Sequence, residues 1–376
     1  MTILDAPADQ EATSPEPIPP KVDLRAWDQR DVVDGVGAAL SSLALTWLVY
    51  EQLTPLSGGL GFFVSWFVVF LLIYSTLVRQ RFGPLAARDR IVQAIINAIG
   101  GIILLALVLL IVYVVFRGAP FLRTTFFYKD QRFTGPLEPA TAGGGLAAIV
   151  GTVEQVGIAM VISVPLGICT ALFLSEVGGP MTRVVRLLTE AMTGIPSILA
   201  GLFVYAFLIL SLHVPQCGFA VAIALSVSML PTVSRSCEVV FRLVPGGLRE
   251  ASLALGGTEW RMARRVLLPT ARAGLVTAII LGIARVAGET APNILDSGYS
   301  NFVNYNPFHG QQDSLPYFIF RLIREPIASE HDRGFTGALV LSGLILVLFV
   351  VARVVGGRGV GRTSWLKRRF RKGVST

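Results

Sequence analysis

The feature that most constrains this chain is the grouping of its apolar residues, which form blocks of about 20 residues instead of alternating or recurring every three to four positions. A bilayer has a hydrocarbon core about 30 Å thick, and a helix needs about 20 residues to cross it. Only helices and closed barrels satisfy every backbone hydrogen bond in lipid. With 53% hydrophobic and 15% charged residues, the chain has the composition of a helical membrane protein.

The apolar blocks predict an all-α polytopic membrane protein with about eight transmembrane helices. The fourth and seventh blocks contain Gly, Thr and Glu among their apolar residues, so their hydrophobic signal is the weakest. The predicted spans cover roughly 33–50, 60–78, 91–116, 147–175, 193–212, 218–240, 271–292 and 336–355.

The two ends of the chain are predicted to be tails. Residues 1–31 are Pro-rich and acidic, which favours a disordered tail. Residues 356–376 are basic and directly follow the last span, where Lys and Arg hold topology and contact anionic lipid. The net charge of +8 therefore indicates contact with membrane lipid, and nucleic-acid binding is not expected.

The placement of Lys and Arg predicts the orientation of the chain, because short loops rich in these residues stay in the cytoplasm. If both termini are cytoplasmic, the inner segments hold 23 of the 32 basic residues and the outer loops hold 7. We therefore expect both tails, and the segment 241–269 between the sixth and seventh spans, to lie in the cytoplasm.

The chain lacks the motifs of ATP hydrolysis and of metal catalysis. It has no GxxxxGK[ST] loop and no Gly-Lys pair, so the usual cradle for nucleotide phosphates is missing. Its histidines, His213, His309 and His331, form no HExxH motif, and the three cysteines lie in or beside predicted spans. We expect no catalytic residue and no metal site, which favours a transporter or channel component over an enzyme.

The predicted cytoplasmic segment contains the stretch EASLALGGTEWRMARRVLLP, residues 250–269. Pro245 can open a helix, since its missing N–H has no partner at that position. Gly256 and Gly257 interrupt this helix, and Thr258 is a candidate N-cap for a second one. Two short helices between spans could be bound by a soluble partner; an amphipathic loop lying in the headgroup layer is the alternative.

This segment resembles the EAA loop of ABC importer permeases, which inserts into a cleft on the ATPase. The resemblance is carried by Glu250-Ala251-Ser252, by Gly256 after three more residues, and by Val266-Leu267-Leu268-Pro269 after nine. Ser252 and Val266 are mild departures from the usual Ala and Ile. The resemblance implies that Glu250, Ala251, Ser252, Gly256, Leu268 and Pro269 couple the chain to a separate cytoplasmic ATPase dimer. ATP and Mg would then be bound by that partner, and this chain would hold no cofactor.

The sequences flanking the loop are similar to the A-type (PstA-type) permease subunits of phosphate-specific ABC importers. These sequences are LPTVSRSCEVVFRLVPGGLREASLALGGTEW, GIARVAGETAPNIL and SLPYFIFRL. The resemblance covers about 91–355 and implies a six-helix type I permease core in a bacterial plasma membrane. It also implies a homologous permease subunit and an extracytoplasmic phosphate-binding protein as partners, while residues 32–90 form two extra helices.

Two charged pairs fall within or near the predicted spans: Arg235 with Glu238, and Arg285 with Glu289. An arginine at mid-bilayer costs about 2.5–3.5 kcal/mol on insertion scales, so it needs a partner. Spacings of three and four residues predict that each pair meets on one helix face. These four residues are the predicted substrate pathway, although the first pair lies near the inner end of its span and could reach lipid headgroups.

Three observations remain open at this level. Glu154 has no obvious partner and could face a second permease or a cavity. The same architecture could carry another oxyanion, such as molybdate or sulfate. A channel or secondary transporter that needs no ATPase is the alternative from another class.

Overall fold

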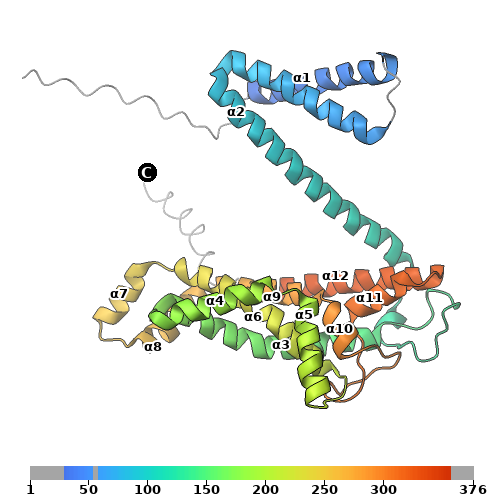
Figure 1. The fold of residues 1–376 in the computed structure, drawn as a ribbon, viewed down its shortest axis with the longest axis vertical. Helices are drawn as coiled ribbons and strands as arrows, with labels where there is room; N and C mark the ends of the chain where they lie inside the picture. Colours follow the sequence, from blue (N-terminus) through green and yellow to red (C-terminus); the bar gives the residue numbers. More distant parts are fainter. Residues whose placement is uncertain (1–28, 54–57, 357–376) are drawn as a thin grey trace, which may run out of the picture. The chain divides into compact units, whose positions relative to one another are not determined.

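The computed structural model describes residues 29–53 and 58–356, and within this part of the chain the regular elements are all helical. The chain divides into two compact units, residues 1–108 and 109–376, both traced in Figure 1. The tail predicted at 1–31 lies outside the described residues except for its last three, and so does the basic tail beyond residue 356. The predicted all-α membrane fold is confirmed.

The first unit contains α1 (Gln29–Trp47), a short π-helical turn η1 (Leu48–Leu53) and most of α2 (Gly59–Gly118). α2 is bent at Gly83, whose φ of 86° is not helical, and Pro84 follows directly. Proline removes a helical N–H and disfavours a helical conformation in the preceding residue, which explains the position of the bend. The bend separates two limbs of α2, which correspond to the second and third predicted spans.

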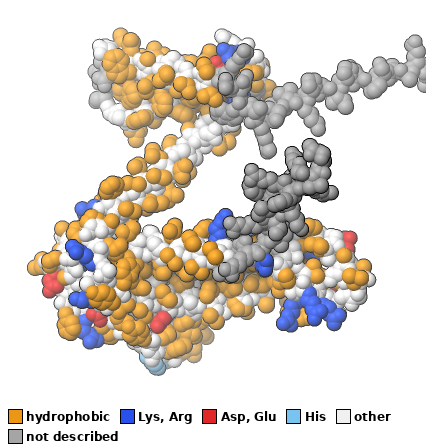
Figure 2. Space-filling view, turned by 180° about the vertical axis from the view of Figure 1, so that it is seen from behind, with side chains coloured by type: hydrophobic (Ala, Val, Ile, Leu, Met, Phe, Trp, Pro, Cys, Tyr) orange, Lys and Arg blue, Asp and Glu red, His pale blue; other side chains and the backbone are white. Residues whose placement is uncertain are grey.

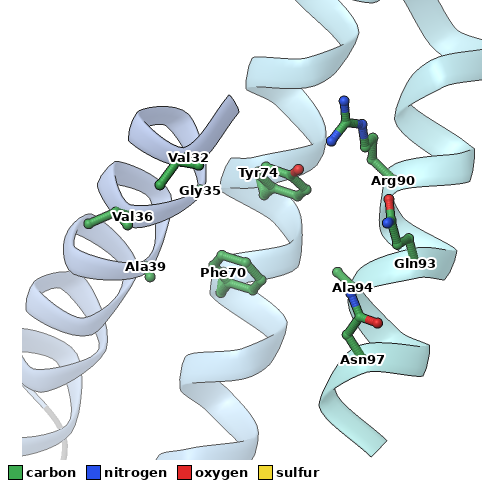
Figure 3. Close-up of a pocket in the computed structure, with 10 residues that line it drawn as sticks. All are labelled: Val32, Gly35, Val36, Ala39, Phe70, Tyr74, Arg90, Gln93, Ala94 and Asn97. Carbon is green, nitrogen blue, oxygen red and sulfur yellow. The ribbon is translucent and has the colours of Figure 1, made fainter. Parts of the chain in front are cut away.

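The two limbs of α2 and α1 pack together through aromatic and small residues. The buried residues of this cluster are Ala38, Tyr74, Val78 and Ala87. Trp66 Nε1 donates to the Ala39 carbonyl at 3.2 Å, which ties the first limb to α1. A groove of about 270 Å³ lies among the three segments (Figure 3); it is lined by Val32, Gly35, Val36, Ala39, Phe70, Tyr74, Arg90, Gln93, Ala94 and Asn97.

The second unit is built around three long helices, α3 (Leu146–Leu172), α6 (Gly218–Arg242) and α9 (Leu268–Ala287). The other elements are η2 (Ala119–Phe121), η3 (Thr124–Phe127), η4 (Phe173–Val177), α4 (Pro180–Gly194), α5 (Ser197–Val204), η5 (Tyr205–Ser211), α7 (Gly246–Ala254), α8 (Glu259–Met262), η6 (Ala263–Leu267), α10 (Ala291–Asp296), α11 (Leu315–Arg324) and α12 (Ala328–Gly356).

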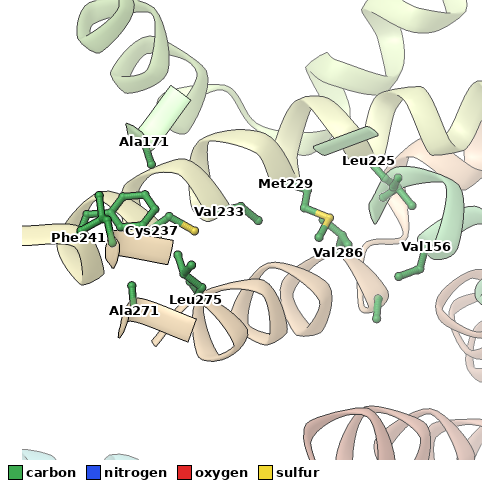
Figure 4. Packing of buried hydrophobic residues seen from close by; sticks show 14 of the residues in the cluster. Val156, Ala171, Leu225, Met229, Val233, Cys237, Phe241, Ala271, Leu275 and Val286 are labelled. Carbon is green, nitrogen blue, oxygen red and sulfur yellow. The ribbon is translucent and has the colours of Figure 1, made fainter. Parts of the chain in front are cut away.

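Small residues let the three central helices approach closely. Gly167 of α3 and Gly282 of α9 both face Val233 of α6, where an added Cβ would lie 2.9 and 2.7 Å from the valine. Ser163 Oγ of α3 donates to the carbonyl of Ser226 in α6. Close backbone approach is the usual way in which helices associate in lipid. Figure 4 shows the apolar side chains of α6 and α9 meeting in this core.

Six helices in the described part of the chain are long and apolar enough to cross a membrane. A seventh crossing is possible if α4 and α5–η5, which are bent by 102°, form one broken span. One of the six, Gly59–Phe121, has 63 residues, or roughly 95 Å at 1.5 Å per residue, which is far longer than one crossing needs. With its bend counted as a break, this helix accounts for two of the eight predicted spans.

Candidate coupling and transport sites

Residues 246–262, here called the handle, form a projection at one end of the second unit (Figure 1). It consists of α7, a turn at Gly256 and Gly257, and α8, as the sequence predicts. The side chain of Thr258 caps α8 by accepting from the backbone N–H of Arg261. Glu250 and Ala251 are exposed on α7, and Ser252 is half-buried.

The turn in the handle depends on two glycines for different reasons. Gly256 has φ of 78°, a left-handed conformation that residues with a Cβ rarely adopt. A Cβ at Gly257 would lie 2.7 Å from the carbonyl oxygen of Ser252, which accepts the Gly257 N–H. The sequence GG therefore ends α7 and sets the start of α8.

The handle is anchored by buried residues at both of its ends. Phe241 and Val244 are buried just before α7, Met262 is buried at the last position of α8, and Leu267 is buried at the end of η6. All four belong to the central core of α3, α6 and α9. A displacement of the handle therefore acts directly on the packed helices.

Leu268 and Pro269 lie outside this projection. The helical run continues from α8 through η6 into α9, so both residues belong to the start of α9. Leu268 packs against the central core, and Pro269 is exposed in the first turn. Their role in coupling stays a prediction, and it would be exerted from the base of the handle.

The handle exposes apolar and basic side chains together. Leu255 is 89% exposed and Trp260 is 68% exposed. Figure 2 shows Lys and Arg side chains gathered at this end of the unit, where Arg261, Arg264 and Arg265 are exposed. Exposed apolar residues rimmed by polar ones are typical of a protein-binding surface.

The predicted pairing of Arg235 with Glu238 is wrong. Arg235 Nη2 lies 3.5 Å from Glu190 of α4, and both side chains are about half exposed. Glu238 is buried and accepts from Arg186 of α4 at 2.9 Å and from Arg242 at 2.6 Å. The reason is that α4 packs beside α6 and brings its own charges to the same face.

The predicted pairing of Arg285 with Glu289 is also wrong within the described residues. Arg285 Nη1 donates to Thr232 Oγ1 of α6 at 3.1 Å. Because α9 ends at Ala287, Glu289 does not lie one helical turn above Arg285. Thr232 lies three residues before Arg235, so both arginines reach the same face of α6.

The sequence pattern does not indicate roles for Arg186 and Glu190, because both lie between the predicted spans 147–175 and 193–212. They lie on α4, which begins with Pro180 and carries Arg183, Arg186 and Glu190 on a helical spacing. An amphipathic pattern of this kind after a proline is the signal that could have found the helix.

A polar cluster joins α3, α10 and the segment before α11. Gln312 donates to Glu154, which therefore has a partner inside this chain, and it accepts from Gln155 at 3.3 Å. Asp296 of α10 is fully buried, and neither carboxylate oxygen has a hydrogen-bond partner. Burial raises the pKa of Asp296 to about 7, so its neutral form is favoured below that pH.

Comparison with known proteins defines the class to which this fold belongs. A family described as "Binding-protein-dependent transport system inner membrane component" matches residues 163–301, which include the handle. A solved bacterial alginate ABC transporter, in complex with its alginate pentasaccharide-bound periplasmic protein, has the same fold with a TM-score of 0.52. It is 15% identical and covers 74% of this chain and 100% of its own. The fold is that of an ABC importer permease.

Relatives of higher identity define the family. The chain is 40% identical over 279 residues to "Phosphate transport system permease protein PstA 1" of Mycobacterium tuberculosis (strain CDC 1551 / Oshkosh), covering 73% of this chain and 89% of that protein. It is 38% identical over 220 residues to the PstA of Yersinia pestis, covering 58% and 74%. The chain belongs to the PstA family of phosphate transport system permease proteins.

Proposed function

We propose that this chain is a membrane subunit of an ATP-driven importer that carries inorganic phosphate into the cell. The observation that carries the proposal is the 40% identity that extends over 89% of a phosphate transport permease. The exposed handle supports it, because a chain without its own ATP-binding motif needs a surface through which a separate ATPase can act.

The handle is the proposed contact with a cytoplasmic ATPase dimer, which would bind ATP and Mg. Glu250, Ala251 and Ser252 lie on α7, and Gly256 sets the turn that follows. Leu255 and Trp260 offer apolar surface for the ATPase cleft. ATP can shift a two-state equilibrium of the permease only if the ATPase binds one state better than the other. The ATPase must therefore bind the handle with different affinity in the two states.

The face of α6 that carries Arg235 and receives Arg285 is the proposed phosphate route. Guanidinium groups offer forked donors and a permanent positive charge to an oxyanion that loses its water. Glu190 and Thr232 hold the two arginines without burying them, since both arginines are exposed in the isolated chain. In the importer this face would line a path shared with a homologous permease subunit, and Glu289, which follows the end of α9, would weaken anion binding enough for release.

The proposed setting is a bacterial plasma membrane with both termini and the handle in the cytoplasm. An extracytoplasmic phosphate-binding protein would deliver its ligand to the opposite side, and membrane lipid would surround the spans. The excess of Lys and Arg in the inner segments supports this orientation.

Phosphate uptake by the reconstituted complex tests the proposed route. Arg285→Gln and Arg235→Gln each remove a permanent charge while keeping a polar side chain of similar length. We expect each to lower uptake at least tenfold, with assembly of the complex unchanged. Arg117→Gln, at an ion pair with Asp332 away from α6, is the matched control. Wild-type uptake by both test variants would remove these residues from the path.

Two alternative functions are distinguished by the same preparation. A permease for molybdate or sulfate would be inhibited by those anions in competition with phosphate. A channel or secondary transporter would show uptake without ATP and would purify without an ATPase or a second permease.

A further inference from the structure

The guanidinium of Arg249 connects the handle to two of the central helices. Arg249 belongs to α7, and its Nη2 atom lies 3.1 Å from Glu176 Oε1, in the π-helical turn η4 that ends α3. The same nitrogen donates to the carbonyl of Phe241 at the end of α6, at 2.7 Å. One side chain therefore touches α7, α6 and the end of α3.

The contact with Phe241 has a cause in the sequence. In a continuing helix, the carbonyl of Phe241 would accept from the N–H four residues later, but that residue is Pro245, which has no N–H. The backbone N–H of Val244 reaches this carbonyl at 3.2 Å, and Arg249 adds a second donor. Arg249 thus supplies a hydrogen bond to a carbonyl that lacks its helical donor at the junction between α6 and the handle.

The arginine of this ion pair is shielded from water more than the neighbouring arginines are. The side chain of Arg249 is 25% exposed, whereas those of Arg186 and Arg242, which both pair with Glu238, are 39% and 60% exposed. Glu176 is as buried as Glu238, since each is 10% exposed. A shielded pair is less screened by salt, and removing one partner leaves the other charge poorly solvated. Glu250, the next residue on α7, is exposed, so adjacent positions face the core and the proposed ATPase.

We propose that the Arg249–Glu176 pair is the joint through which movement of the handle is passed to α3 and α6. This inference rests on the proposed function, because it assigns a path to force delivered by the ATPase. Arg249 and Glu176 are positioning residues: they touch neither phosphate nor ATP. Their role is to keep α7 and the ends of α3 and α6 moving as one body.

The test is the number of phosphate ions transported per ATP hydrolysed by the full complex in proteoliposomes. Arg249→Gln and Glu176→Gln should each lower this ratio at least fivefold while ATP hydrolysis continues. The double variant Arg249→Glu/Glu176→Arg should recover the ratio to within about threefold of wild type, since it restores an ion pair of reversed polarity. Arg117→Gln should leave the ratio unchanged.

Three results would contradict the proposed role of the Arg249–Glu176 pair. The single variants could keep the wild-type ratio, the swapped pair could recover nothing although the complex assembles, or Arg117→Gln could lower the ratio equally. A purely structural role would reduce assembled complex and ATP hydrolysis together and leave the ratio constant, which also contradicts the proposal. Deletion of Ala251 to Gly256 distinguishes failure of this proposal from failure of the proposed function. If the deletion variant keeps the wild-type ratio of phosphate to ATP, the proposed coupling role of the handle itself is wrong.

Discussion

In the core of α3, α6 and α9, apolar side chains are buried against small residues, whereas in the handle they are exposed. Met229, Val233 and Phe241 have no accessible surface, but Leu255 on the handle is 89% exposed. Both regions belong to one continuous chain and differ in what they pack against. The core packs against itself, whereas Leu255 and Trp260 on the handle face outward, which is typical of a surface that binds another protein.

The two regions also use glycine differently. Gly282 in the core makes room for Val233 of the facing helix, while Gly256 in the handle supplies a backbone conformation with open space around it. The comparison therefore predicts packing strain from substitutions in the core and altered association from substitutions in the handle.

The largest effect is expected for Gly282→Leu in the core. The new Cβ would lie 2.7 Å from Val233 Cγ2, and overpacking of this kind costs about 3 kcal/mol. Thermal unfolding of the purified chain in detergent measures this loss of stability as a lower midpoint temperature. Gly101→Leu in α2 is the matched control, because no atom lies within 4 Å of its added Cβ. Equal midpoints for both variants would contradict the close approach of α6 and α9.

A smaller effect, which depends on pH, is expected at Asp296, outside the candidate spans. Its folded pKa of about 7 lies above the ordinary value of 3.8, so the folded state holds the proton more tightly. Its contribution to stability is complete below about pH 4 and is lost as pH rises through 7. Between pH 5 and 8 the wild type should lose about 2 kcal/mol more than Asp296→Asn, whose amide does not ionise.

Unfolding midpoints of the two proteins across this pH range measure the difference. The amide variant should show a flatter pH profile and match the wild type most closely at acidic pH. Parallel profiles would mean that Asp296 is solvated or paired, which would contradict its burial beside α5.

The smallest effect is expected for Leu255→Ser in the handle. Folding should be unchanged, because the side chain is exposed, while binding of the ATPase should weaken by about 1 kcal/mol, or roughly fivefold. Titration of the ATPase onto the permease in nanodiscs measures the Kd. Phe133→Ser is matched in exposure at 88% and lies in the predicted outer loop, so it should have no effect. Equal Kd values for both variants and the wild type would contradict the assignment of the handle as the binding surface.

The sequence predicted the features that depend on neighbouring residues. The apolar blocks predicted the helical spans, Gly256 predicted the end of α7, and Thr258 predicted the cap of α8, since each signal lies within or next to the helix that it specifies. The family was recognisable because the handle and its flanks carry a long motif of fixed spacing.

The partners of the charged residues could not be predicted in this way. Arg235 contacts a glutamate 45 residues earlier, and Arg285 contacts a threonine 53 residues earlier. A pairing predicted from a spacing of three or four residues assumes that both partners lie on one helix. In the structure, both arginines instead contact residues of a neighbouring helix. α4 was missed for a related reason, because a short charged helix beside a span has no apolar block to mark it.

The central claim is that the handle faces the cytoplasm and is gripped by an ATPase. Ala254→Cys places a thiol on the exposed face of α7, in a Cys169→Ser background that removes the exposed native cysteine and leaves the two buried ones. A membrane-impermeant thiol reagent should label this site in inside-out vesicles, and bound ATPase should block the labelling. Labelling from the outside of right-side-out vesicles, or labelling that the ATPase does not change, would contradict the account.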